Sequence, residues 1–196
     1  PTPKSIYFFY IMIIKMTEQF FKEAKEELQK SLVKKGHPFR YFTLATIGVE
    51  SIARLRTVVL RQITSDFKLI FYTDKRSKKV THIKENSNVS LLFYHPKLML
   101  QLKIEGTATI ETNQKVIKNY WSGIQPNSRK DYITQQAPGS TIKDPSTVDY
   151  LDEENHFCMV EIEPFKVEYL KLKRPNHLRL RFSKNQDNWE GEFLVP

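Results

Sequence analysis

Cysteine and glycine are scarce in this sequence, and no hydrophobic run is long enough to span a membrane. Cys158 is the only cysteine, which excludes an internal disulfide and a cysteine-based zinc site. The six glycines form neither G-x-G-x-x-G nor G-x-x-x-x-G-K-S/T, so phosphate binding by a glycine-rich loop is not expected. The apolar run of residues 6–14, IYFFYIMII, is shorter than the roughly 20 residues of a membrane helix. These absences favour a reduced, cytoplasmic protein without a membrane span.

Motifs for metal binding and for hydrolysis are absent as well. The five histidines, at positions 37, 82, 95, 156 and 177, form no H-E-x-x-H and no other close metal-binding spacing. No nucleophile elbow of the hydrolase type occurs. Cys158 lies in the apolar run of residues 157–160, which is typical of a buried structural cysteine rather than a catalytic thiol. We therefore expect no metal site, and residue types alone identify no catalytic group.

The chain does have sufficient length for a core and a strong positive charge. With 196 residues, 40% of them hydrophobic, it is long enough for one domain with a sizeable buried core. No internal repeat or low-complexity linker divides it. The formal net charge of +9 points to an anionic partner, such as nucleic acid, an acidic surface or a phosphorylated ligand.

The first residues differ in character from the rest of the chain. Residues 15–18, Lys-Met-Thr-Glu, read as an ordinary protein start placed directly after the apolar run. The run is followed by no small-residue cleavage site of the kind that ends a signal peptide. We therefore expect residues 1–15 to be an upstream extension or a cloning or start-site artefact, and residues 16–196 to form a single domain.

Hydrophobic periodicity predicts one long helix and then mostly strands. The helix is expected over residues 17–35, with Thr17 as its N-cap and Gly36 just past its end. Short helices are expected over 77–86, 114–121 and 127–135, and a polar loop over 139–155. Strands are expected over residues 40–47, 55–63, 67–73, 89–95, 98–111, 156–163, 166–172, 177–182 and 189–195. Closely spaced strands with short turns predict a mainly β fold, a β-barrel with peripheral helices.

A basic turn is the first candidate site. Residues 72–79, YTDKRSKK, end a predicted strand and lead into a helix, so four cations, hydroxyl side chains and free backbone amides converge there. Such a turn can hold a phosphate dianion without glycine, through charge-assisted hydrogen bonds. The alternative is a solvated basic turn or a nuclear-localisation-like patch.

Three strands carry further candidates. Arg56 and Arg61 bracket a strongly β-forming strand, and they either meet an anion or are simply solvated. Gln101 lies on the polar face of the strand of residues 98–111, where its amide suits a flavin or a base, or is exposed and idle. Residues 177–181, HLRLR, place three polar side chains on one strand face, as an anion contact or an ordinary barrel exterior.

Taken in order, these segments resemble the pyridoxamine 5′-phosphate oxidase-like FMN-binding proteins, whose fold is the FMN-binding split barrel. The resemblance runs from about residue 39 to the C-terminus and rests on the order and spacing of its motifs. They are residues 56–61 (RTVVLR), 71–74 (FYTD), 76–79 (RSKK), 88–93 (NVSLLF), 101–106 (QLKIEG) and 177–182 (HLRLRF). The resemblance implies an FMN cofactor, and a homodimer with two FMN molecules bound across the subunit interface.

Site residues follow from the resemblance position by position. It implies FMN contacts at Arg56, Thr57, Val58, Val59, Leu60, Arg61, Tyr72, Thr73, Arg76, Ser77, Lys78, Lys79, Gln101 and Arg181. Among these, the segment Ser77-Lys78-Lys79 would hold the phosphate and Gln101 would contact the isoalloxazine ring. Arg76 is added because close relatives carry it.

The substrate half of the site departs from the family pattern. True pyridoxamine 5′-phosphate oxidases hold the substrate with Arg-x-His in the last motif, whereas this chain has His177 and Arg179 in the reverse order. Where the family has a tryptophan near the flavin, this chain has Leu170. The family's arginine that binds the substrate phosphate falls, by position, near Ile124 of this chain. Tyr120 matches the helical tyrosine that contacts substrate there. Tyr120, His177 and Arg179 are therefore the candidate substrate residues.

Three functions remain open from the sequence. The first is an FMN-dependent oxidoreductase of this family with an unsettled substrate. The second is a non-catalytic FMN-binding or storage protein, which the reversed motif at His177 and Arg179 also fits. The third is a basic nucleic-acid-binding module, in which Tyr72, Phe93 and Tyr94 would stack bases. The spread of basic residues along the chain disfavours this third function.

Overall fold

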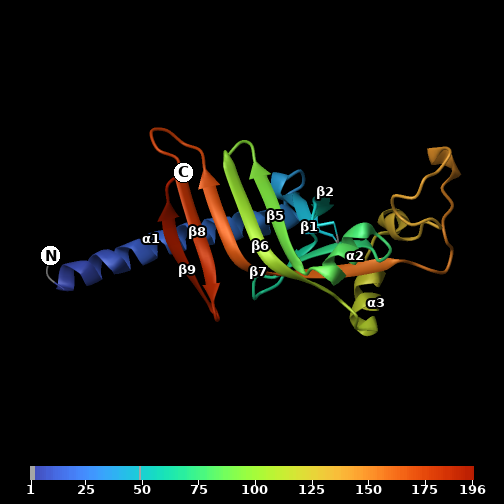
Figure 1. The fold of residues 1–196 in the computed structure, drawn as a ribbon, viewed down its shortest axis with the longest axis horizontal. Helices are drawn as coiled ribbons and strands as arrows, with labels where there is room; N and C mark the ends of the chain where they lie inside the picture. The colour runs from blue at the N-terminus through green and yellow to red at the C-terminus, as the bar shows by residue number, and fades with distance from the viewer. Residues whose placement is uncertain (1–2, 49) are drawn as a thin grey trace.

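The computed structural model describes the backbone of residues 3–48 and 50–196, with side chains at residue 12 and from 14 onward except 49. Its centre is a nine-stranded antiparallel sheet that curls into a half-barrel (Figure 1). The strands are β1 (Tyr41–Ile47), β2 (Ala53–Val59), β3 (Gln62–Ile63), β4 (Leu69–Asp74), β5 (Asn88–His95), β6 (Leu100–Ile110), β7 (Phe157–Lys171), β8 (Leu178–Asn185) and β9 (Asn188–Leu194). The prediction of a mainly β fold with peripheral helices is confirmed.

Strand β7 joins the two parts of the sheet. The strand order is β2-β1-β5-β6-β7-β4-β3, and β8 and β9 continue from β7. The first half of β7 pairs with β4, over Phe157 to Ile162, and its second half pairs with β8, over Lys166 to Lys171. β6 pairs along almost the whole of β7. One long strand therefore serves both parts of the half-barrel.

The prediction of two separate strands over 156–163 and 166–172 is wrong, because β7 is continuous. Lys166 pairs with Glu105 and Pro164 pairs with Gly106, so Phe165 is an extra residue on β7. Proline cannot donate to the ladder, and such a position is tolerated at a bulge. A side chain at Gly106 would lie 2.7 Å from the carbonyl oxygen of Glu163, so the close approach of β6 and β7 requires glycine there.

The first helix is longer than predicted and begins earlier. α1 runs from Pro3 to Val33 without a break at residue 16, and its first turns extend beyond the sheet (Figure 1). Thr17 is not an N-cap: its hydroxyl donates to the carbonyl oxygen of Ile14 and its side chain packs against Gly191 of β9. Gly36 adopts a φ of +73°, as the predicted helix end requires.

The remaining helices lie at the edges of the sheet. They are η1 (Pro38–Arg40), α2 (Lys78–Glu85), α3 (Gln114–Ser122), α4 (Pro126–Arg129), η2 (Lys130–Tyr132) and η3 (Pro145–Thr147). The predicted helix over 127–135 is thus two short helical turns. The segment between η2 and β7 extends past the sheet at the end opposite the N-terminus (Figure 1). No helix in the described chain is both long enough and apolar enough to cross a bilayer.

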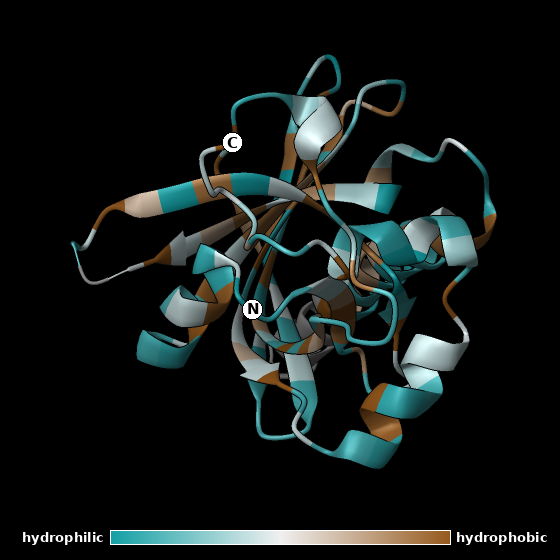
Figure 2. Cartoon of the chain, turned by 90° about the vertical axis from the view of Figure 1, so that its right-hand side faces the viewer, coloured by the Kyte–Doolittle hydropathy of each residue, from teal (hydrophilic) through white to brown (hydrophobic). Residues whose placement is uncertain are grey.

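Two hydrophobic clusters form the core. Alternating strand residues, visible as brown and teal bands in Figure 2, send one set of side chains inward and the other outward. The main cluster lies inside the half-barrel, where Phe39, Phe71 and Phe93 are fully buried, and α1 covers it with Leu28. A second cluster, built on Phe157 and the residues of α3 and η2, lies on the outer face of β4 and β7. The second cluster places α3 beside the predicted site.

Candidate functional site

The predicted basic turn forms a corner between β4 and α2. Ser77 is the N-cap residue of α2, but its side chain makes no capping bond and lies 3.2 Å from the Thr73 hydroxyl instead. Lys79 donates to that same Thr73 hydroxyl at 2.9 Å. No side chain therefore caps the first turn of α2, which lies next to a lysine, and this arrangement is suited to an anion.

Two cations at this corner have no carboxylate partner. Burial lowers the pKa of Lys79 and nearby Arg56 lowers it further, while nearby Asp74, which is ion-paired with Arg76, acts in the opposite direction. Burial also lowers the pKa of Arg56, whose guanidinium donates only to the Thr46 hydroxyl and the Leu44 carbonyl. Among the described residues, no carboxylate oxygen lies within 4.0 Å of either cation. Desolvated cations without a counter-ion are costly, so the corner fits a phosphate dianion.

Arg76 has a different role from the one that the resemblance implies. Its guanidinium forms a two-point ion pair with buried Asp74, at 2.7 and 3.1 Å. The same group donates to the carbonyl oxygens of Thr134, Gln135 and Gln136. Nε of Arg76 donates to Asp74 alone, whereas Nη1 and Nη2 tie the segment after η2 to the corner.

A cavity of about 240 Å³ opens next to the corner, and we call it the cofactor cavity. Seven predicted FMN residues line it: Thr57, Val58, Val59, Arg61, Tyr72, Thr73 and Lys79. Arg56 and Lys78 open instead into a neighbouring cavity on the outer side of α2. Leu60 is fully buried in the main core, so only its backbone can serve the site. The structure therefore brings together most of the residues carried by the first half of the chain.

A second cavity of about 340 Å³ adjoins the cofactor cavity and is called the side cavity here. Both cavities are lined by Arg61, Tyr72 and Tyr132, and the predicted substrate residue Tyr120 lines the side cavity. The guanidinium carbon of Arg61 lies 5.6 Å from the centre of the Tyr72 ring. Burial, with a smaller effect of nearby Tyr120, raises the pKa of Tyr72 to about 12, so this phenol remains neutral. Arg61 and Tyr72 thus form the boundary between the two cavities.

Sequence reasoning missed the residues that η2 and the following segment contribute. Asp131, Tyr132 and Pro138 line the cofactor cavity, and Tyr132 is 95% buried in the second hydrophobic cluster. The polar segment that contains them has no motif, and its approach to the corner depends on the Arg76 bonds. No local sequence signal could have identified them.

Four predicted residues lie elsewhere on the chain. Gln101, His177, Arg179 and Arg181 line neither cavity within the described structure. Arg179 is ion-paired with Glu168 at 2.9 Å, and Arg181 with Glu192 at 2.8 Å. Gln101 pairs with Leu170, and Leu170 pairs with Arg179, so these residues form a row across β6, β7 and β8. One copy of the chain does not bring the two halves of the predicted site together.

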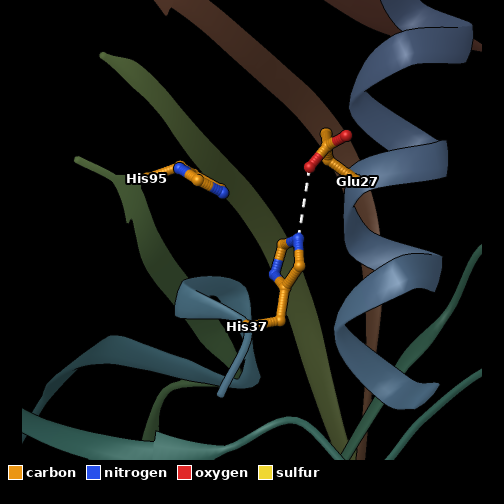
Figure 3. Close-up of side chains that lie close together, drawn as sticks. All are labelled: Glu27, His37 and His95. Atoms are coloured by element: carbon orange, nitrogen blue, oxygen red, sulfur yellow. Dashed lines mark hydrogen bonds and ion pairs between the residues drawn. The ribbon is translucent and has the colours of Figure 1, made fainter. Parts of the chain in front are cut away.

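A cluster of Glu27, His37 and His95 is the candidate metal site, and its ligand atoms lie within 4.8 Å of one another (Figure 3). Nδ1 of His37 accepts from the Phe39 amide, and Nδ1 of His95 accepts from the Leu98 amide. Each neutral ring therefore carries its proton on Nε2, the nitrogen that faces the cluster. Nε2 of His37 then donates to Glu27 at 3.2 Å. A metal ion at Nε2 would require the proton to move onto Nδ1 and break a backbone bond, so the geometry favours a hydrogen-bonded structural cluster.

Comparison with known proteins agrees with the geometry. Residues 18–112 match the family model of the pyridoxamine 5′-phosphate oxidase FMN-binding domain. A pyridoxine/pyridoxamine 5′-phosphate oxidase of Leptospira interrogans is 27% identical over 194 residues, covering 90% of this chain and 87% of that protein. One from Psychrobacter cryohalolentis is 43% identical over 65 residues, or 33% of this chain and 30% of that protein.

Two solved structures share the fold. A pyridoxamine 5′-phosphate oxidase-related, FMN-binding protein of Nostoc punctiforme superposes with a TM-score of 0.75 at 24% identity, over 89% of this chain and 96% of that one. PhzG of Burkholderia lata superposes with a TM-score of 0.72 at 20% identity, over 91% of both chains. The split-barrel fold, the matched FMN-binding domain and the phosphate-suited corner together lead to one conclusion. Residues 18–112 match an FMN-binding domain, and the chain as a whole is similar in sequence and fold to the pyridoxamine 5′-phosphate oxidase-like FMN-binding proteins, whose cofactor is FMN.

Proposed function

We propose that the protein is an FMN-dependent oxidoreductase that holds the FMN phosphate at the β4–α2 corner. The observation that carries this proposal is the pair of half-buried cations, Arg56 and Lys79, without a carboxylate partner. A phosphate there would supply the missing counter-charge and accept hydrogen bonds from Lys79 and the first turn of α2. When bound, FMN supplies the electron-transfer chemistry at its ring.

The residues of this chain then position the cofactor and the substrate. Thr57 and Val59 form one wall of the cofactor cavity. Arg61 and Tyr72 line both cavities, so a ring that extends from the corner would meet a substrate in the side cavity at this boundary. Tyr72 is neutral and can donate a hydrogen bond there. The segment held by Arg76 covers the cofactor cavity and limits the access of water.

We further propose that the active form is a homodimer. The outer face of β2, β1 and β5 has no charged residue over Ala53, Leu55, Thr57, Val59, Tyr41, Thr43, Ala45, Ile47, Ser90, Leu92 and Tyr94. Leu55 and Tyr41 on this face are 68% and 58% exposed, although 27% of the whole chain is charged. An exposed apolar patch of this kind is typical of a protein interface.

A second copy is the partner that this face fits. The face is continuous with the cofactor cavity at Thr57 and Val59, and it ends beside Gln101, the partner of Tyr94 on β6. A two-fold interface apposes equivalent surfaces, so it can bring Gln101 of the partner subunit toward the cofactor cavity. The two separated halves of the predicted site would then meet between subunits.

Turnover and mass in solution test the proposal. The FMN-loaded protein is expected to release peroxide or reduce an acceptor with a substrate of the side cavity, and to have the mass of two chains. Leu55→Glu places a charge in the interface and should yield single chains with weaker FMN binding. Leu98→Glu, a partly exposed residue of the β5–β6 turn, is the matched control. A wild-type protein of one-chain mass contradicts the dimer.

A non-catalytic FMN-binding protein is the second candidate. The ion pairs of Arg179 with Glu168 and of Arg181 with Glu192 favour it, because these arginines are not free to hold a substrate. A protein that binds FMN but shows no turnover with pyridoxamine or pyridoxine phosphate, or with any compound that binds the side cavity, would support this candidate.

A further inference from the structure

We infer that the side cavity binds a planar aromatic carboxylate, a monoanion, in preference to a phosphate monoester. This inference rests on the proposed function, since the compound would lie against the ring of bound FMN. It goes beyond that function by naming the class of substrate, and it follows from the charge and shape of the cavity lining.

Arg61 is the one charged residue among the residues that line the side cavity in the described structure. It is half-buried, and no carboxylate oxygen of a described residue lies within 4.0 Å of it. A guanidinium matches a carboxylate with two parallel hydrogen bonds, so one arginine is sufficient for one carboxylate. The lining that one copy of the chain provides therefore balances one negative charge, and Arg179 and Arg181, which a second copy would bring, are already ion-paired with Glu168 and Glu192.

The other nearby charges do not add a second cation. Arg129 donates to the carbonyl oxygens of Ile124, Trp121 and Ser122, and its guanidinium lies 5.0 Å from the Trp121 ring centre. Asp131 lines the adjoining cofactor cavity and carries negative charge. Ile124, on the wall of the side cavity, is apolar. A phosphate dianion in this cavity would keep a charge without a partner.

The corner at α2 shows what a dianion site looks like in this same chain. It combines two cations without carboxylate partners, Arg56 and Lys79, with the uncapped first turn of a helix. The side cavity has one cation, and the helix start in its lining, at Gln125, belongs to α4, which is only four residues long. The difference in charge between these two sites is the physical basis for expecting different anions.

Aromatic walls define the shape of the ligand. The rings of Tyr72 and Tyr120 lie 6.1 Å apart, and Tyr132 also lines the cavity. The Tyr120 hydroxyl donates to the Gln62 side chain at 2.9 Å, which holds its ring in place. Asn119, Gln125 and Ser128 supply neutral hydrogen-bonding groups at the rim. The Tyr72 and Tyr120 rings meet edge to face, and such fixed phenol rings on the wall of a mostly uncharged cavity favour an aromatic ligand that packs against their faces and edges.

A matched set of probes tests the inference on the FMN-loaded protein. Isothermal titration calorimetry would compare 2-naphthoate with 2-naphthyl phosphate and with the neutral 2-naphthol, which share one ring system. We expect 2-naphthoate to bind roughly tenfold or more tightly than either of the others, because one charge-assisted pair with Arg61 is gained. Equal or tighter binding of 2-naphthyl phosphate, or no binding of 2-naphthoate, would overturn the inference.

Two variants distinguish the contribution of the Arg61 cation to ligand binding from that of the other residues that line the side cavity. Arg61→Gln should weaken 2-naphthoate binding by roughly tenfold or more and leave 2-naphthol unchanged. Ile124→Arg adds a second cation and should raise the affinity for 2-naphthyl phosphate. Lys118→Gln removes an exposed cation of α3 outside the cavity and should change neither. Unchanged naphthoate binding in Arg61→Gln overturns the inference, as does unchanged phosphate binding in Ile124→Arg.

The flavin spectrum keeps this test apart from the test of the proposed function. The absorbance of bound FMN reports whether the cofactor is present in each variant, and the calorimetric signal reports the probe. A protein that binds no FMN contradicts the proposed function, whereas a yellow protein that prefers the phosphate ester contradicts only the substrate class. If Arg61→Gln loses FMN, the Ile124→Arg result decides between the two anions.

Discussion

Two polar clusters in this molecule differ in whether their charged groups have partners within the chain. At the β4–α2 corner, Arg56 and Lys79 are desolvated and meet no carboxylate among the described side chains. Under α1, Glu27 receives hydrogen bonds from Lys30 and His37, and the histidine Nδ1 atoms accept backbone amides. The first cluster lacks an anion, whereas in the second the Glu27 carboxylate accepts hydrogen bonds from both Lys30 and His37. Unmet charge indicates a binding site, whereas a closed network indicates a structural role.

The largest effect is expected from removing the cations of the corner. Arg56→Gln combined with Lys79→Met should lower FMN affinity by roughly 100-fold or more, because two charge-assisted contacts to the phosphate are lost. The thermal midpoint of the FMN-free protein should stay the same or rise, since desolvated charges are removed. Absorbance of retained flavin and equilibrium dialysis measure the first effect.

Lys75→Gln is the control for this double variant. Lys75 is an exposed cation of the same turn, so the Lys75→Gln variant should bind FMN as tightly as the wild type does. Unchanged FMN affinity in the double variant would show that the phosphate is held by neither Arg56 nor Lys79.

The closed cluster should respond in stability and not in FMN affinity. Glu27→Ala leaves the Nε2 proton of buried His37 without an acceptor, so the free energy of unfolding should fall by about 1–3 kcal/mol. Glu26→Ala, an exposed neighbour on the same helix, is the control. Chemical denaturation of both FMN-free variants measures the difference, and a loss of FMN affinity in Glu27→Ala would contradict the separation of the two clusters.

The closed cluster should also respond to pH. Burial, with a smaller effect of nearby His37, lowers the pKa of His95 below the 6.5 of a free histidine. The unfolded chain therefore binds a proton more readily than the folded one, and this stability is lost as pH falls below about 6.5. The slope is at most about 1.4 kcal/mol per pH unit for one proton.

His95→Asn isolates this contribution. The asparagine oxygen can still accept the Leu98 amide but does not titrate, so stability measured between pH 7 and 5 should fall less steeply than in the wild type. His156 stays in both proteins, and its pKa is lowered by burial and by Arg76, so a residual slope is expected. Identical slopes in the two proteins would assign no pH dependence to His95.

The smallest effect is expected from zinc. Because metal binding would break the bonds from the Phe39 and Leu98 amides to Nδ1, added Zn²⁺ should leave the unfolding midpoint unchanged. Differential scanning calorimetry with and without Zn²⁺ checks this, and His37→Gln serves as the comparison. A zinc-dependent rise that His37→Gln abolishes would make the closed cluster a metal site.

Local patterns predicted most of the strands and the turn between β4 and α2. The alternation of Leu100, Gln101 and Leu102 predicted which faces are buried, and the burial of β6 confirms it. The turn that contains Lys79 was recognisable because its charges are adjacent in sequence. Patterns failed at Thr17 and Pro164, because a cap residue can sit inside a longer helix and a proline can sit in a bulge when the partner strand allows it.

Sequence alone predicted the mainly β fold, because strand periodicity is a local property of the chain, and the order of its motifs indicated the similarity to FMN-binding split-barrel proteins. Tertiary structure decided that Arg76 ties down a loop, that Tyr132 lines the cofactor cavity, and that Arg61 is the lone charge lining the side cavity within the described structure. These features depend on contacts between side chains from distant segments. Only those contacts decide whether a charged side chain has an ion-pair partner.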